Sequence, residues 1–334
     1  MCNLTPLFDQ SLFHDCRTRT VGTTPQALAA PNQYFVPGDI FAYTYNQGAR
    51  LVGTTSATKL SIAAVTWSGA ATAFIRSVTL YVDGVAQDHS YYQGAQFDAI
   101  PYRWEVTLDG NPHTIEIEEA APVVGVYANA PITWTARYAP KYRVLIVGDS
   151  ISTGQGASVA NLSWPMLLRH SLTSGPAGYG VAVQARSGAL LGNAPYTQLA
   201  SLCDGTTRNV VVVSLMINDH ILSSTTGQFQ SATDTVCAGI LANTPAGTRI
   251  VLVTAPQCPN TYGGATLAQL RAIFTAKAAA NPGVIYCVDN TSLFAGGTPW
   301  AGYLGGDGIH PIDAGHLALK DAVRPVVITA ATAP

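Results

Sequence analysis

The pattern of hydrophobic residues changes abruptly near Ala139-Pro140, and this change constrains the fold more than any other feature of the chain. Before it, short runs rich in Val, Ile, Thr, Tyr and Trp are separated by turn residues, which is typical of strands with one buried face. After it, apolar runs alternate with segments of helical length, which is typical of a parallel sheet covered on both faces. The sequence therefore predicts an all-β domain over residues 31–139 and an α/β domain over 140–334, preceded by an irregular lead-in over residues 1–30.

The all-β half contains several short runs with the alternation of half-buried strands. The predicted strands cover residues 60–67, 77–82, 103–108, 113–119 and 132–138. Asp83-Gly84 and Asp109-Gly110 indicate hairpin turns, because glycine tolerates the positive φ that such turns need. Many short strands with regular turns favour a β-sandwich of the jelly-roll kind.

The α/β half reads as buried strands followed by helices. The strands are predicted at RVLIVGDS (143–150), VVVVSLMIND (210–219), RIVLVTAP (249–256) and VIYCVD (284–289), and the helices at 163–172, 228–243, 266–280 and 311–328. Ligands of such sheets bind beyond the carboxyl ends of the strands. Polar residues at those ends are therefore candidates for a functional site.

Ser150, Asp307 and His310 have the chemistry of a nucleophile and its activating groups. Ser150 follows the first buried strand, and His310 follows Asp307 by three residues, just before the last helix. A serine hydroxyl is a weak nucleophile and needs an adjacent base, which His310 can supply. A carboxylate must orient the imidazole and stabilise its protonated form, and one tight turn could place Asp307 there.

Acyl transfer also needs hydrogen-bond donors aimed at the developing oxyanion. The candidates are the backbone N–H groups of Ser150 and Gly188 and the side-chain amide of Asn218, which follows the second buried strand. Asp149 and Asp219 are predicted to hold loops rather than to react. His316 could be a second base, but a histidine packed in the last helix is the more frequent case.

Four segments in this order resemble the conserved blocks of SGNH (GDSL) hydrolases: GDSISTGQGA (148–157), RSG (186–188), IND (217–219) and DGIHP (307–311). The resemblance covers about residues 142–330. It implies a flavodoxin-like, three-layer α/β/α fold, ester hydrolysis and no metal or other cofactor. It also implies that Ser150, Gly188, Asn218 and His310 are the family's functional residues, with Asp307 as the acid.

One position departs from the family pattern. The residue before the asparagine is usually glycine or another small residue, and here it is Ile217. A β-branched side chain at this position is expected to narrow the substrate pocket or to alter the loop that carries Asn218.

Charge and hydropathy exclude several other classes of function. Charged residues make up only 11% of the chain, the net charge is −2 and no basic run occurs, which argues against nucleic-acid binding. No apolar stretch is long enough to span a membrane. The first residues lack the features of a signal peptide. Low charge and six cysteines nevertheless favour a secreted or periplasmic protein.

The cysteines are compatible with disulfides or with ordinary buried thiols. Pairing between neighbours in the sequence would give Cys2–Cys16, Cys203–Cys237 and Cys258–Cys287, but six cysteines allow 15 connectivities. No C-x-x-C pair occurs, which argues against a zinc site.

Three functions fit these observations. An α/β hydrolase behind a β-domain resembles bacterial esterases that remove O-acetyl groups from polysaccharides, so the first is an esterase for short acyl groups on a carbohydrate. The second is a broad short-chain carboxylesterase for small esters, and the third a non-catalytic carbohydrate-binding protein. Exposed aromatics could stack on sugar rings, although most such residues pack in cores; the candidates are Trp67, Trp104, Trp134, Tyr91, Tyr92 and Tyr102. The sequence does not set the oligomeric state.

Overall fold

The computed structural model of the chain describes most of the α/β half and parts of the β half. The described residues are 3–5, 33–34, 44–47, 49–67, 78–87, 99–119, 123–134, 140–158, 162–173, 178–194, 203, 208–260, 262–294 and 302–334. The chain divides into two compact units, one of Met1–Ala139 with Val159–Asn161 and the other of Pro140–Ser158 with Leu162–Pro334.

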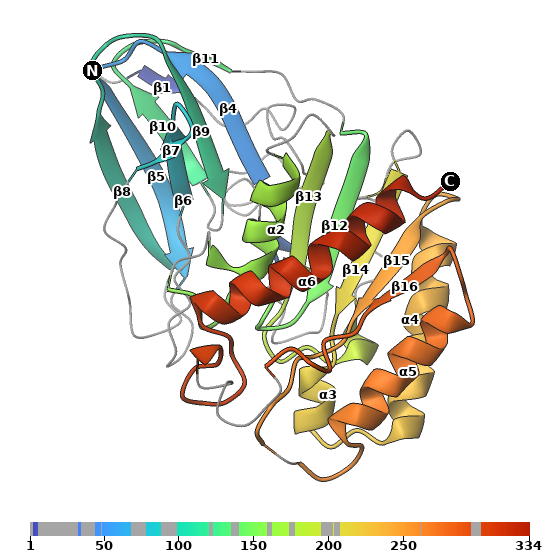
Figure 1. Cartoon of the computed structure of the whole chain (residues 1–334). Helices are drawn as coiled ribbons and strands as arrows, with labels where there is room; N and C mark the ends of the chain where they lie inside the picture. The colour runs from blue at the N-terminus through green and yellow to red at the C-terminus, as the bar shows by residue number, and fades with distance from the viewer. Residues whose placement is uncertain are drawn as a thin grey trace. The chain divides into compact units, whose positions relative to one another are not determined.

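The N-terminal unit contains two antiparallel sheets in its described part (Figure 1). The first has the strand order β1 (Asn3–Thr5), β10 (Val123–Ala128), β5 (Lys59–Trp67), β8 (Ala99–Thr107). The second has the order β11 (Ile132–Trp134), β4 (Ala49–Thr55), β9 (His113–Glu119), β6 (Val78–Val82), β7 (Val85–Ala86). β2 (Gln33–Tyr34) pairs antiparallel with β3 (Thr44–Gln47).

The two sheets share one apolar core, which makes this unit a β-sandwich. Leu60 and Ile62 of β5 belong to the same buried cluster as Ile115 and Ile117 of β9. In β9 these isoleucines are buried whereas the intervening Glu116 is less so, as expected for a strand with one face on the core. Trp134 also packs against this cluster, so it is part of the core. The side chains of the other five candidate aromatics lie outside the description.

Two predictions for this unit need correction. Asp83-Gly84 does form a hairpin turn between β6 and β7, with positive φ at both residues. Asp109-Gly110, however, connects β8 of one sheet to β9 of the other, so it is a turn but not a hairpin, because turn residues do not specify which strands pair. Asn3–Thr5, predicted to be irregular, pairs with β10 as a strand. The rest of the predicted lead-in lies outside the described residues.

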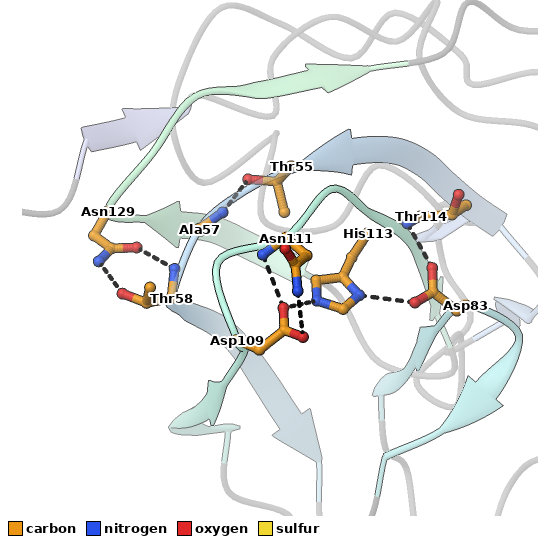
Figure 2. A network of polar contacts seen from close by, with 9 residues as sticks. All are labelled: Thr55, Ala57, Thr58, Asp83, Asp109, Asn111, His113, Thr114 and Asn129. Atoms are coloured by element: carbon orange, nitrogen blue, oxygen red, sulfur yellow. Dashed lines mark hydrogen bonds and ion pairs between the residues drawn. The ribbon is translucent and has the colours of Figure 1, made fainter.

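A histidine clamped between two aspartates joins two turns of this unit (Figure 2). His113 Nδ1 lies 2.7 Å from Asp83 Oδ2, and His113 Nε2 lies 2.7 Å from Asp109 Oδ1. Asp83 also accepts the N–H of Thr114, and Asp109 accepts the N–H of Asn111. Only the imidazolium can donate from both ring nitrogens, and the hydrogen bonds to Asp83 and then Asp109 raise the pKa of His113.

The C-terminal unit is built on a parallel sheet. Its own strands have the order β16 (Ile285–Val288), β15 (Arg249–Val253), β14 (Arg208–Ser214), β12 (Tyr142–Gly148), β13 (Tyr179–Ala185). Counted along the chain, this is the 2-1-3-4-5 order of flavodoxin-like folds. Every residue of β12 is buried, because helices cover both faces of such a sheet and the strand reads as a continuous apolar run.

The helices are placed by crossovers between these strands. They are α2 (Trp164–Thr173), α3 (Ile217–Ile221), α4 (Thr226–Asn243), α5 (Leu267–Ala279) and α6 (Asp313–Thr332), with a 3₁₀ turn η3 (Leu191–Asn193). α2 contacts α6, which crosses one face of the sheet, and α4 packs on α5 (Figure 1). Since the crossovers change direction after β13, right-handed connections place these pairs on opposite faces. This is the predicted three-layer fold.

Sequence signals at the starts of two helices account for their boundaries. Thr225 accepts the N–H of Gln228 before α4, and Thr266 accepts the N–H of Gln269 before α5. The side-chain oxygen of each glutamine in turn accepts the backbone N–H of the threonine, which completes a capping box.

The predicted local disulfides are wrong where the structure describes them. Cys237, Cys258 and Cys287 are free thiols, so neither Cys203–Cys237 nor Cys258–Cys287 forms. Burial raises the pKa of Cys237 and of Cys287 to about 11, which is the behaviour of thiols packed as small apolar side chains. Cys2 and Cys16 lie outside the described residues. These thiols therefore do not support the prediction that the protein is secreted or periplasmic, which stays a prediction.

Two further searches bear on possible sites. Within the described residues, no group of three or more His, Cys, Asp or Glu side chains could hold a metal ion. None of the described helices is long and apolar enough to cross a membrane.

We predict that the His113 clamp stabilises the protein in a pH-dependent way. Because folding raises the pKa of His113, its contribution is complete below the unfolded value of about 6.5 and is lost as pH rises through the higher folded value. His113→Gln should therefore lower the melting temperature more at pH 5.5 than at pH 8.5. Thermal unfolding by circular dichroism at both pH values measures this difference.

Asn129→Ala is the matched control for this clamp. Asn129 accepts the N–H groups of Thr58 and Lys59 in a neighbouring turn and does not titrate. Asn129→Ala should therefore lower the melting temperature by the same amount at the two pH values. If His113→Gln also lowered the melting temperature equally at pH 5.5 and pH 8.5, the charge of the imidazole would contribute nothing to stability.

Candidate active site

Three adjacent strands end at the same level, and this register gathers the candidate residues. Gly148 at the end of β12 is paired with Ala185 of β13 and with Ser214 of β14. Ser150 therefore lies two residues beyond the shared level, Gly188 three residues and Asn218 four. The strand order reverses between β13, β12 and β14, which is where ligands of open α/β sheets bind.

Ser150, His310 and Asp307 form one chain of hydrogen bonds. Ser150 Oγ lies 2.8 Å from His310 Nε2, although the two residues are 160 positions apart. His310 Nδ1 lies 2.6 Å from Asp307 Oδ2. If Nδ1–H donates to the carboxylate, Nε2 carries the lone pair that accepts the serine proton. This tautomer is the one that a general base requires.

Asp307 is held in its ionised form by its own turn. Burial alone would raise its pKa, but hydrogen bonds from the His310 side chain and from the N–H groups of His310 and Ile309 outweigh burial, so the pKa of Asp307 is lowered. Oδ1 accepts these two N–H groups at 3.0 and 2.9 Å, which leaves Oδ2 for the imidazole. Asn260 fixes the turn from outside by donating to the Asp307 carbonyl.

Of the three candidate oxyanion donors, Ser150 and Gly188 lie on the loops that follow β12 and β13, and Asn218 lies in α3, which follows β14. The N–H groups of Ser150 and Gly188 donate to no other described residue. Gly188 has φ +73°, and a Cβ built there would meet nothing within 4 Å, so this loop borders open space. Asn218 Nδ2 donates one hydrogen to the Ala189 carbonyl at 3.1 Å, which ties α3 to the loop that follows β13.

Ile217 is directed into the interior of the unit. It is only 3% exposed and lines a small pocket with Asp149, Met216 and Val253. The bulk of the Ile217 side chain is therefore expected to affect the packing beneath the site. The local backbone supports this: Ile217 begins α3, and the helix carries Asn218 to the surface side.

Asp149 holds the turn that presents Ser150. Its carboxylate accepts the N–H of Ile151 at 3.0 Å, and Thr153 donates its hydroxyl to the Ser150 carbonyl at 2.7 Å. Complete burial raises the pKa of Asp149 to about 7. Its contacts are with this turn, as predicted from its place at the strand end.

A set of contacts that the sequence did not reveal aligns the serine loop with the histidine loop. A Cβ on Gly156, where φ is +93°, would lie 2.2 Å from the Pro311 carbonyl oxygen, so only glycine permits this approach. Asp313 accepts both the N–H and the hydroxyl of Ser158, at 2.7 and 2.6 Å. No sequence spacing signals pairs more than 150 residues apart; the glycines of GQGA were the one available hint.

His316 supports the same alignment from within the core. Its Nδ1 accepts the N–H of Trp164 at 3.2 Å, so its Nε2–H donates to the Gln155 carbonyl, also at 3.2 Å. Burial lowers the pKa of His316 to about 4, which keeps it neutral in this role. His316 is thus a packed helix histidine, and it has no contact with Ser150.

Comparisons with known proteins identify the family to which the chain belongs. The C-terminal unit is a flavodoxin-like α/β/α domain whose polar residues meet at its switch point. Residues 146–318 match the GDSL-like Lipase/Acylhydrolase family, and the chain belongs to that family. No curated protein sequence matches the chain.

Solved structures share the fold over 88% to 100% of the chain at low sequence identity. The salicylyl-acyltransferase SsfX3 from a tetracycline biosynthetic pathway is 14% identical with a TM-score of 0.71, over 100% of this chain and 98% of that one. A family two carbohydrate esterase from Clostridium thermocellum, in complex with cellohexaose, is 15% identical with a TM-score of 0.59, over 88% and 96%. A family two carbohydrate esterase from Cellvibrio japonicus is 14% identical with a TM-score of 0.59, over 90% and 93%.

We predict that Gly156→Ala impairs turnover by moving the histidine loop. The added methyl group cannot coexist with the Pro311 carbonyl, and the positive φ adds strain of about 1–3 kcal/mol. Because His310 precedes Pro311, its contact with Ser150 should lengthen, and hydrolysis of an aryl acetate should slow at least tenfold. Steady-state kinetics measure the effect.

Gly227→Ala is the matched control. Gly227 lies in α4, and a Cβ there would meet nothing within 4 Å. This change should leave turnover unaltered and shift stability by no more than about 1 kcal/mol. Full activity of Gly156→Ala would show that the close approach of the loops is dispensable.

Proposed function

We propose that this protein is a serine esterase that hydrolyses short acyl esters through an acyl-enzyme intermediate. The observation that carries the proposal is the hydrogen-bonded series from Ser150 Oγ through the His310 ring to the Asp307 carboxylate, at 2.8 and 2.6 Å. Membership of an acylhydrolase family supports the same reaction.

In the first half of the reaction, Ser150 Oγ attacks the acyl carbon while its proton moves to His310 Nε2. Asp307 stabilises the imidazolium that results. The N–H groups of Ser150 and Gly188 and the free amide hydrogen of Asn218 are assigned to the oxyanion of the tetrahedral intermediate. His310 then returns the proton to the leaving alkoxide, which departs as an alcohol.

In the second half, water attacks the acyl carbon of the Ser150 ester and gives its proton to His310. Collapse of the second tetrahedral intermediate releases the carboxylic acid, and the serine oxygen recovers its proton. The residues described provide every proton transfer, so the mechanism requires no further group from the protein.

For the substrate we propose an O-acetyl group on a polysaccharide. Support comes from the combination of a β-sandwich unit with the hydrolase unit and from shared fold with two carbohydrate esterases, one of them described in complex with cellohexaose. A small ester without a sugar is the alternative substrate. The similar fold of an acyltransferase makes acyl transfer a further alternative, in which an alcohol replaces water as the acceptor of the acyl group in the second half of the reaction.

Substitutions in the catalytic series should abolish turnover without unfolding the protein. We expect Ser150→Ala to lower kcat for an aryl acetate at least a thousandfold, because the nucleophile is lost. Asp307→Asn should also cause a large loss, because the amide cannot stabilise the imidazolium. Ser171→Ala, which removes only a bond to the Leu168 carbonyl in α2, is the control and should be fully active.

A substrate panel then separates the proposed activities. Acetate release from acetylated xylan at a higher kcat/KM than from aryl acetate supports the polysaccharide substrate. Equal turnover of aryl acetate and butyrate with no release from glycans supports a broad carboxylesterase. Formation of a new ester in the presence of an added alcohol would indicate transfer, and inactivity of the folded wild type on every ester would refute the enzymatic proposal.

A further inference from the structure

Two consecutive side chains at the start of α3 hold the same loop. Asn218 Nδ2 donates to the Ala189 carbonyl at 3.1 Å, and Asp219 Oδ2 accepts the N–H of Leu191 at 2.9 Å. The loop after β13, which carries Gly188, is thereby attached to α3, which carries both side chains. The two bonded pairs are 29 and 28 residues apart in the sequence.

Hydrogen bonds hold the Gly188 loop on both sides. Upstream, the N–H of Arg186 donates to the Gly148 carbonyl at the end of β12, at 3.0 Å. Downstream, the Ala189 carbonyl accepts from Asn218 and the Leu191 N–H donates to Asp219. Gly188 lies between these bonds with φ +73°. A Cβ at this position would meet nothing within 4 Å, so no neighbouring group packs against that side of Gly188. Removal of the Asp219 carboxylate would free the Leu191 N–H, leave the Ala189 carbonyl held by Asn218, and so loosen the segment that runs from Gly188 to Leu191.

Burial of Asp219 calls for an explanation other than stability. The residue is only 4% exposed, and burial raises the pKa of its carboxyl despite hydrogen bonds from Leu191 and Ser224. A buried carboxylate is costly, and an apolar side chain of similar volume often serves stability as well or better. An acceptor at this position does, however, fix the orientation of the Leu191 N–H, and an apolar side chain cannot do that.

We propose that Asp219 is a positioning residue that sets the geometry of the oxyanion site. It holds the Gly188 loop against α3, so that the Gly188 N–H and the second amide hydrogen of Asn218 face one point. Asp219 itself touches no reacting atom. This inference rests on the proposed esterase function, because it assigns the two donors to the oxyanion.

Three single variants test the proposal. Asp219→Ala should lower kcat for an aryl acetate tenfold to a hundredfold with KM changed less than threefold, because only transition-state stabilisation is lost. Asp219→Asn keeps an acceptor for the Leu191 N–H and should restore kcat to within threefold of the wild type. Ser224→Ala removes the other bond to Asp219, at 3.3 Å, and should leave kcat unaltered.

A double variant tests whether Asp219 acts through the oxyanion donors. Asn218→Ala should lower kcat by about a hundredfold, as expected for the loss of one donor. If Asp219 places that donor, Asn218→Ala with Asp219→Ala should lose less than the product of the two single losses. Fully multiplicative losses would overturn the proposed coupling.

Melting temperature is measured for each variant to separate positioning from folding. Should Asp219→Ala fail to fold, Asp219→Leu fills the volume without an acceptor and should show the same loss of kcat. Wild-type kcat in either folded variant, or equal losses in Asp219→Asn and Asp219→Ala, would overturn the inference. Failure of the proposed function is distinguishable, since it would appear as full activity in Ser150→Ala, whatever the Asp219 variants do.

Discussion

The in-register ends of β12, β13 and β14 are the constraint on which the whole site depends. Because Gly148 is level with Ala185 and Ser214, three loops leave the sheet at one height and side by side. Full burial of β12 between its neighbours makes this register costly to change. The chemistry is then a matter of short distances along each loop. His310 is the exception, since it comes from beyond the last strand and must be brought in by separate contacts.

Those contacts show how a loop and a helix substitute for sheet register. Gly156 lies against the Pro311 carbonyl, Ser158 is bound by Asp313, and Gln155 is bound by His316. Two of these three partners belong to α6, whose buried face packs on the sheet. The position of the base is therefore set by the same core that sets the position of the nucleophile.

The sequence predicted what depends on local pattern and missed what depends on partners distant in the chain. The apolar run of β12, the strand at residues 113–119 and the residues of the catalytic series could all be identified from spacing and chemistry. β13, with its glycine, alanines and glutamine, has too weak a strand pattern to be recognised, and neighbouring strands impose its conformation. The cysteine pairs failed because proximity in sequence does not bring two thiols together in space. The sequence predicted that Asp219 holds a loop but not that its partner is Leu191, and it assigned no role to Gly156, because these partners are far away in the chain.

The environments of three carboxylates decide which of them can face the imidazolium. Asp149 and Asp219 are buried, and burial raises the pKa of both, to about 7 for Asp149. Asp307 is substantially exposed, and its turn supplies enough hydrogen bonds to lower its pKa in spite of partial burial. At neutral pH it is the carboxylate whose surroundings favour full ionisation, which is the state needed to stabilise a protonated histidine. The fold therefore uses two buried acids to fix loops and keeps the ionised one for His310, and the difference between these roles follows from burial and hydrogen bonding rather than from residue type.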